Sequence, residues 1–210
     1  MAQAAAVTTT HDHGHDGGHD HAVPYTSTGI SMWKVGFWVF LGSETLFFGT
    51  LISAYMVYKH ESVVGPYSSE LLDIPITSIS TFVLLMSSLA MVLALDALQH
   101  QTRKKAVIYT LLTAGLGCVF LGFQAFEFTH FFHEGLTLQK NLFGSTFFVL
   151  TGFHGAHVSI GVMWLLILAV DIMRGRTGPK ESLRLEIAGL YWHFVDIVWI
   201  AIFTLIYLIK

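Results

Sequence analysis

Five long apolar stretches follow residue 30, and they constrain the fold more than any other feature of this sequence. We place them at about 33–58, 75–98, 105–127, 142–170 and 187–209. Each can cross a hydrocarbon core of about 30 Å, which takes about 20 helical residues. Runs such as residues 162–170 do not alternate apolar and polar side chains, as the strands of a membrane barrel do. The sequence therefore predicts an all-α integral membrane bundle of five transmembrane helices over residues 31–210.

Composition excludes several other classes of protein. Only 12% of the residues are charged and 53% are hydrophobic, whereas a soluble domain has about 25% charged residues. The net charge of -3 gives no basic surface for nucleic acid. One cysteine leaves no disulfide framework and no cysteine-based metal centre. A soluble enzyme and a nucleic-acid-binding protein are both excluded.

The first 30 residues differ from the rest of the chain, because they contain no long apolar run. They lack the basic and apolar regions of a secretory signal, so we expect a disordered, solvated tail. Histidines alternate with aspartates in this tail, and neutral imidazoles in such a tract can bind transition metals. These weak candidates for metal ligands are His11, His13, His15, His19 and His21.

The basic residues near the ends of the spans orient the bundle. Eight of them belong to one side of the membrane: Lys34, Arg103, Lys104, Lys105, Arg174, Arg176, Lys180 and Arg184. Only Lys59, Lys140 and Lys210 belong to the other side. Loops on the cytoplasmic side carry the excess of Lys and Arg in membrane proteins. We therefore expect a cytoplasmic N-terminus and a C-terminus outside the cell.

Glu44 is the clearest ionisable residue inside a predicted span. It lies in the middle of the first span, and the nearest charged residue in the sequence, Lys34, is ten positions away. Ionisable residues are costly in lipid, so they face the bundle interior or mark a function. Two interpretations are open: a proton-handling or chemically modifiable carboxyl group, or a structural carboxylate bonded to a neighbouring helix.

Pairs of polar residues share a helix face in the last two spans. His154 and His157 are three positions apart in the fourth span, and His193 and Asp196 are three apart in the fifth. Glu127 lies near the end of the third span. Polar groups in lipid need partners, so we expect interhelical hydrogen bonds and His–Asp pairing.

Two other classes of membrane protein stay open from the residues alone. A membrane cytochrome would place His154 or His157 opposite His193 as haem ligands. A proton-coupled transporter would need substrate groups in mid-membrane, although no Gly- or Pro-broken helices recur in two halves of the chain. A ferritin-like di-iron site does not fit, because neither of the last two spans holds a Glu-x-x-His motif. We expect no metal in the membrane domain.

Four ordered segments closely resemble subunit III of the haem–copper oxidases. They are FWVFLGSETLFFGTLISAY (37–55), FLGFQAFEF (120–128), GSTFFVLTGFHGAHVSIG (144–161) and YWHFVDIVWIAIF (191–203). The resemblance covers about residues 33–210. The long form of that family has seven helices, and the first span here resembles its third. The chain therefore looks like a short form with five helices.

The resemblance implies a supporting subunit of a proton-pumping terminal oxidase in aerobic respiration. In that family, the haems and copper belong to subunits I and II, so we expect no cofactor and no catalytic residue in this chain. The resemblance also implies packing against subunit I, contact with subunit II and a small subunit IV, bound phospholipid, and support of proton uptake. Its location would be a bacterial-type plasma membrane.

The resemblance also assigns roles to single residues. The family's buried, carbodiimide-reactive Glu falls on Glu44, and its lipid-facing His falls on His157. The family's partner Arg falls near Asp171, and Arg174 is close to that position without matching it. The other structural or lipid-contact candidates are His154, His193, Asp196 and Glu127.

The electron donor has two candidates. Residues 43–48 look more like the cytochrome c type of the family, whereas the quinol type tends to have Asp at the position of Glu44. The short form with a His-rich tail is also similar to bacterial quinol oxidases. We predict a cytochrome c oxidase subunit, with a quinol oxidase subunit as the alternative.

Overall fold

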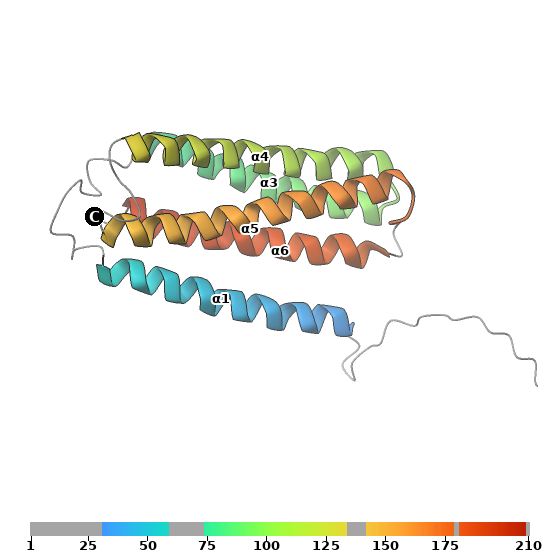
Figure 1. The fold of residues 1–210 in the computed structure, drawn as a ribbon. Coiled ribbons are helices and arrows are strands. Elements are labelled where there is room, and N and C mark those ends of the chain that lie inside the picture. Colours follow the sequence, from blue (N-terminus) through green and yellow to red (C-terminus); the bar gives the residue numbers. More distant parts are fainter. Residues whose placement is uncertain (1–30, 59–73, 134–141, 179–180, 209–210) are drawn as a thin grey trace, which may run out of the picture.

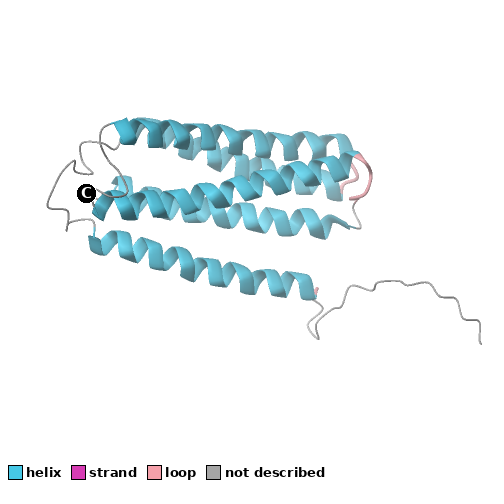
Figure 2. Ribbon diagram, viewed as in Figure 1, coloured by secondary structure: helices cyan, strands magenta, loops and turns pink. Residues whose placement is uncertain are grey.

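The structure, a computed structural model, describes residues 31–58, 74–133, 142–178 and 181–208. Five long helices fill these ranges (Figures 1 and 2): α1 (Met32–Tyr58), α3 (Ile74–Gln99), α4 (Arg103–His133), α5 (Leu142–Met173) and α6 (Ser182–Phe203). A short π-helical segment, η2 (Thr204–Leu208), continues α6. All five helices are long and apolar enough to cross a membrane, and the described residues contain no strand. The predicted all-α membrane bundle is confirmed, while the His-rich tail lies outside the described residues.

Two helices, α4 and α6, extend furthest beyond the predicted ranges. The span expected over 105–127 continues to His133, because residues 128–133 contain no Pro or Gly and Phe131 is buried in the core. Glu127 therefore lies well inside α4 rather than near its end. The span expected from residue 187 begins at Ser182. Leu185 is fully buried there, and Glu186 pairs with Lys34, so a charged first turn still packs on the bundle.

The two tight turns at one end of the bundle have the same backbone cap. After α3, Gln101 takes a left-handed φ of 59°, and the Thr102 N–H donates to the Ala97 carbonyl at 2.9 Å. After α5, Gly175 takes a φ of 76°, and the Arg176 N–H donates to the Asp171 carbonyl at 2.9 Å. This six-to-one bond satisfies a carbonyl that the helix end leaves open. Between α3 and α4 the chain reverses within residues 100–102.

Four helices form a ring, and α1 lies outside it (Figure 1). Within the ring, α3 and α5 each pack against both α4 and α6. The outer helix α1 contacts mainly α5 and α6. Only 11% of the residues in its most apolar 18-residue segment are buried, against 50% in α6. The attachment of α1 therefore depends on few contacts.

Two tryptophans of α6 fill the centre of the ring. Trp192 and Trp199 are seven positions apart on one helix face, and both are almost completely buried. Two glycines leave room for the indole of Trp192: a Cβ atom would come within 2.6 Å of it at Gly117 of α4, and within 3.0 Å at Gly161 of α5. Small residues thus allow close helix packing without a hydrophobic driving force from water.

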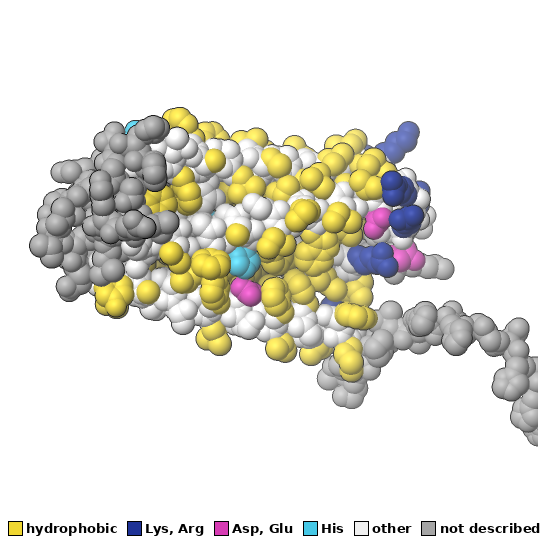
Figure 3. All heavy atoms as spheres, viewed as in Figure 1, with side chains coloured by type: hydrophobic (Ala, Val, Ile, Leu, Met, Phe, Trp, Pro, Cys, Tyr) yellow, Lys and Arg dark blue, Asp and Glu magenta, His cyan; other side chains and the backbone are white. Residues whose placement is uncertain are grey.

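Lys and Arg side chains gather at one end of the bundle (Figure 3). This is the end where α1 and α6 begin and where the two tight turns lie. The topology therefore brings together the loops that the sequence assigned to one side of the membrane. The cytoplasmic location of this end is still a prediction from the charges of these loops.

Candidate functional site

Glu44 of α1 and His157 of α5 meet between the outer helix and the ring. The distance between Glu44 Oε2 and His157 Nε2 is 3.2 Å, and the two side chains are 19% and 15% exposed. Figure 3 shows an acidic side chain and a histidine side by side in the middle of an otherwise apolar face. The sequence singled out both residues but did not pair them.

The contacts of His157 indicate which of its two ring nitrogens carries a hydrogen. His157 Nδ1 lies 2.7 Å from the Phe153 carbonyl oxygen, so Nδ1 carries a hydrogen and donates it. A neutral imidazole then has only an acceptor left at Nε2. A hydrogen bond between His157 Nε2 and the Glu44 carboxyl group therefore requires a hydrogen on one of these two groups.

Aromatic rings and a tyrosine fix the position of this imidazole. The ring of Phe48 lies 5.0 Å from that of His157 and the ring of Phe47 lies 6.4 Å away, measured between centroids. The Tyr191 hydroxyl of α6 donates to the His157 carbonyl at 3.1 Å. Aromatic rings of α1 thus pack beside the imidazole, while the pair itself is still partly exposed on the surface between α1 and α5.

His154 faces the centre of the ring, away from His157. It is fully buried, and its Nε2 lies 3.2 Å from the Val195 carbonyl oxygen of α6. Its ring is 4.8 Å from Trp199 and 5.7 Å from Phe120. The contact with α6 identifies His154 as an interhelical hydrogen-bonding residue of the core.

His193 and Asp196 of α6 both contact Ser88 of α3. The Ser88 hydroxyl oxygen lies 2.6 Å from His193 Nδ1, and the same hydroxyl hydrogen-bonds the Asp196 carboxyl group. Asp196 is buried and His193 is half-buried. The expected bonding to a neighbouring helix is therefore present, with a serine that sequence reasoning did not select.

The three histidines selected in α5 and α6 point to three different helices. His154 bonds to α6, His157 contacts α1, and His193 contacts α3. This arrangement does not place His154 or His157 opposite His193, which a haem held by that pair would require. Among the described residues, no group of three or more His, Cys, Asp or Glu could hold a metal ion. The five tail histidines lie outside that part of the chain.

Further polar bonds between helices were missed at the sequence level. The Trp199 indole N–H donates to the Thr81 hydroxyl at 2.9 Å, and the Trp192 indole N–H donates to the Ser87 hydroxyl at 2.9 Å. The Gln124 amide of α4 donates to the Thr151 carbonyl of α5 at 2.6 Å. The small polar residues of α3 at positions 77, 81 and 88 share one helix face, and that spacing was the available signal.

Glu127 belongs to the same set of bonds between helices. The buried Thr77 hydroxyl of α3 donates to its carboxyl group. Each of these bonds satisfies a polar group that lipid cannot hydrogen-bond. Together, these bonds fix the positions of α3, α4, α5 and α6 relative to one another along the bundle.

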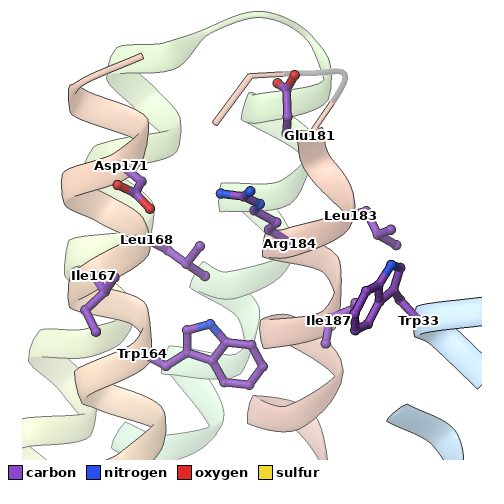
Figure 4. A pocket seen from close by; sticks show the side chains of 9 residues that line it. All are labelled: Trp33, Trp164, Ile167, Leu168, Asp171, Glu181, Leu183, Arg184 and Ile187. Carbon is purple, nitrogen blue, oxygen red and sulfur yellow. The ribbon is translucent and has the colours of Figure 1, made fainter. Parts of the chain in front are cut away.

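A pocket of about 620 Å³ lies at the basic end, between the start of α1, the end of α5 and the start of α6 (Figure 4). Figure 4 shows the Arg184 side chain extending between α5 and α6 toward Asp171, above the ring of Trp164. Arg174, the residue expected near a lipid, is exposed and does not line this pocket. The lining residues are Trp33, Trp164, Ile167, Leu168, Asp171, Glu181, Leu183, Arg184 and Ile187.

The chain matches one protein family over nearly its whole length. The family model described as cytochrome c oxidase subunit III matches residues 9–210. The chain belongs to this family of haem–copper oxidase subunits. Membership confirms the resemblance of the four segments. Together with the five membrane-spanning helices, it identifies this subunit III as a multi-pass protein of the bacterial plasma membrane.

Two bacterial relatives are similar to the chain over most of its length. It is 40% identical over 177 residues to the probable quinol oxidase subunit 3 of Staphylococcus saprophyticus, covering 84% of this chain and 88% of that protein. It is 38% identical over 197 residues to the quinol oxidase subunit 3 of Bacillus subtilis strain 168, covering 94% of this chain and 97% of that protein. These names favour the quinol alternative over the cytochrome c prediction.

Proposed function

We propose that this subunit III belongs to a haem–copper terminal oxidase that takes its electrons from a quinol. The observation that carries this proposal is the match with relatives named quinol oxidase subunit 3, at 38% identity over 94% of the chain. It replaces the cytochrome c type as the preferred reading of the sequence, because the match extends over nearly all of the chain, whereas residues 43–48 are one short segment.

A cytochrome c oxidase is the second candidate, and one observation favours it. Glu44 occupies the position at which the quinol type tends to have Asp. The longer side chain of Glu44 reaches His157 across the gap between α1 and α5. The side chain of an Asp at this position would be one methylene shorter. The length of Glu44 therefore has a structural explanation, the contact with His157, that holds for either electron donor.

Within either complex, we assign this chain a supporting role. Oxygen reduction and proton translocation would take place at the haems and copper of subunits I and II. The interhelical bonds of His154, His193 and Asp196 are of the kind that stabilises a bundle. Packing against subunit I, contact with subunit II and a small subunit IV, bound phospholipid and sustained proton uptake complete the proposed role. The basic end would face the cytoplasm.

The donor is tested on the native complex purified through this chain. Its haem spectrum and its rate of oxygen consumption are measured with a reduced quinol and with reduced cytochrome c in separate reactions. We expect haem to co-purify and turnover to occur with the quinol alone. Turnover with cytochrome c alone would reverse the order of the two candidates. A Soret band in the isolated chain would contradict a subunit without redox centres.

A further inference from the structure

The charges that line the pocket at the basic end favour a neutral ligand. The lining has one guanidinium, from Arg184, and two carboxylates, from Asp171 and Glu181. Glu181 lies at the opposite end of the pocket from Trp164 (Figure 4), and its carboxylate accepts from the Gly178 N–H at 2.9 Å. Negative charge therefore exceeds positive charge, so an anionic group such as a phosphate is disfavoured here. A neutral hydroxyl group, which can donate to a carboxylate, fits these charges better.

Arg184 and Asp171 offer a donor and an acceptor to the same group of a ligand. The Arg184 guanidinium extends toward Asp171 (Figure 4), yet no ion pair joins them among the described residues. The contact of Asp171 with Arg176 is long, at 3.8 Å, and Arg176 is exposed, so this contact contributes little. A guanidinium only donates hydrogen bonds, and a carboxylate only accepts them. A hydroxyl group between the two can accept from the first and donate to the second.

The membrane side of the pocket is a wall of apolar and aromatic side chains. Trp164 and Ile167 of α5 and Ile187 of α6 lie on this side (Figure 4). The Trp164 ring is held by the rings of Phe37 and Tyr191, whose centroids lie 6.1 and 5.8 Å from its own. The pocket volume of about 620 Å³ lies within the range of about 300–1,000 Å³ that is typical of small-ligand sites. A flat aromatic ring with an apolar tail fits this wall, because aromatic rings stack favourably on one another.

We propose that this pocket binds one molecule of quinol, separate from the quinol that the complex oxidises. One hydroxyl group of this quinol donates to the Asp171 carboxylate, and its oxygen accepts from the Arg184 guanidinium. The ring stacks on Trp164, and the tail lies along Ile167 and Ile187 toward the membrane. This inference rests on the proposed function, because the electron donor of the complex is then an aromatic diol dissolved in the same membrane. The quinol is bound here without electron transfer.

The two oxidation states of this ligand should bind with different affinities. The reduced ring has a hydroxyl hydrogen for Asp171, whereas the oxidised ring has a carbonyl oxygen that can only accept. The Arg184 guanidinium donates to the oxygen in both states. We therefore expect the quinol to bind about tenfold more tightly than the quinone, the ratio that one hydrogen bond to a charged group gives.

The test uses the purified oxidase complex containing the full chain, in detergent and oxygen-free buffer. A photoreactive azido-ubiquinone labels the complex, and the labelled peptides are identified by mass spectrometry. Decylubiquinol and decylubiquinone, each in excess over haem, compete with the label in separate reactions. We expect label on the peptides where α5 ends and α6 begins, and about tenfold stronger competition by the quinol. Absence of label from these peptides, or equal competition by the two forms, would overturn the proposal.

A phospholipid is the occupant from which the quinol must be distinguished. The labelling is repeated with phosphatidylethanolamine or phosphatidylglycerol at the concentration at which decylubiquinol halves the label. We expect neither lipid to lower the label as far as the quinol does. Displacement by either lipid at the level of the quinol would assign the pocket to lipid and overturn the proposal.

Variants separate the roles of the two charged groups. Asp171→Asn should bring the affinities for quinol and quinone close together, because an amide can donate as well as accept. Arg184→Gln should weaken the binding of both forms. Lys104→Gln is the matched control, since Lys104 is exposed at the same end and does not line the pocket. The same change of the affinity ratio in Lys104→Gln as in Asp171→Asn would refute a specific site. If Arg184→Gln fails to assemble, Asp171→Asn and the wild type still decide.

Turnover measurements on the same preparation separate this inference from the proposed function. The haem spectrum is recorded, and oxygen consumption is measured with a quinol and with reduced cytochrome c in separate reactions. Turnover with quinol, without label where α5 ends and α6 begins, would sink this inference alone. The expected labelling in a complex that oxidises only cytochrome c would count against the proposed donor alone.

Discussion

Glu44 of α1 lies 3.2 Å from Nε2 of His157 of α5, and the other imidazole nitrogen lies 2.7 Å from the Phe153 carbonyl oxygen. This contact joins the least buried helix of the bundle to the ring. The pair of Lys34 and Glu186 does the same at the basic end. Tyr55, fully buried near the other end of α1, supplies a third attachment. The outer helix is therefore held at three levels.

Replacing Glu44 with Gln should keep this attachment. The Gln amide can donate to His157 Nε2, so the interhelical bond persists. We expect an unchanged haem spectrum and an initial turnover reduced by less than about threefold, the size of one interhelical hydrogen bond in a membrane. Absorbance spectra and oxygen consumption of the complex check this. Complete loss of oxygen reduction would contradict a supporting role for the chain.

Replacing Glu44 with Leu should have a larger structural effect. Leu cannot bond to His157, which leaves the imidazole without this partner between two helices. We expect the thermal stability of the complex to fall below that of Glu44→Gln, while Leu46→Ala on the exposed face of α1 serves as the control. Equal stability of the Leu and Gln variants would show that the contact does not hold α1.

The packing of Trp192 against glycine makes a further prediction. A methyl group at Gly117 would come within 2.6 Å of the indole, whereas at Gly115 nothing lies within 4 Å. Gly117→Ala should therefore destabilise the subunit by about 1–3 kcal/mol, as overpacking does. Gly115→Ala, two positions away on the same helix, should be neutral or slightly stabilising. Thermal unfolding of both variants is the measurement, and equal midpoints would refute this account of the core.

Sequence reasoning predicted the five helices because lipid imposes a simple rule: every span must be apolar and must satisfy its own backbone bonds. The predicted helix ends were wrong where packing contacts extend a helix into a polar segment. Leu185 and Glu186 extend α6 into a charged segment because one is buried and the other is paired. Phe131 extends α4 by entering the core. Such contacts depend on residues of other helices, and the hydropathy of a single segment contains no information about them.

Pairings between helices were the part that the sequence could not predict. Glu44 and His157 are 113 positions apart, and Ser88 and His193 are 105 apart. Glu44, His157 and His193 could each be selected alone, because an ionisable group in lipid needs a partner, whereas Ser88 carried no such signal. Its partner depends on the order of the helices around the ring and on their rotation. The pocket lined by Asp171 and Arg184 likewise depends on side chains from three different helices.

The bond between Trp199 and Thr81 provides another prediction. The indole N–H donates to the hydroxyl at 2.9 Å in the buried core. Trp199→Phe and Thr81→Val should each destabilise the subunit, and the double variant should cost less than their sum. The expected coupling is about 0.6–1.7 kcal/mol, the range for such bonds in membrane proteins. A double-mutant cycle of thermal or denaturant unfolding measures this coupling. Strictly additive changes in the free energy of unfolding would show that the bond does not contribute to stability.

Ser88 links both polar residues of α6 to α3, and this gives the last prediction. His193→Ala combined with Asp196→Ala removes both contacts with the serine and leaves cavities in a face that α3 covers. We expect less of this chain to co-purify with the haem-bearing subunit, and Ser88→Ala alone to produce part of the loss. Ile197→Ala on the same helix is the control, because Ile197 is 64% exposed and faces away from α3. Co-purification of the double variant at the level of this control would show that α6 keeps its position through Trp192 and Trp199 alone.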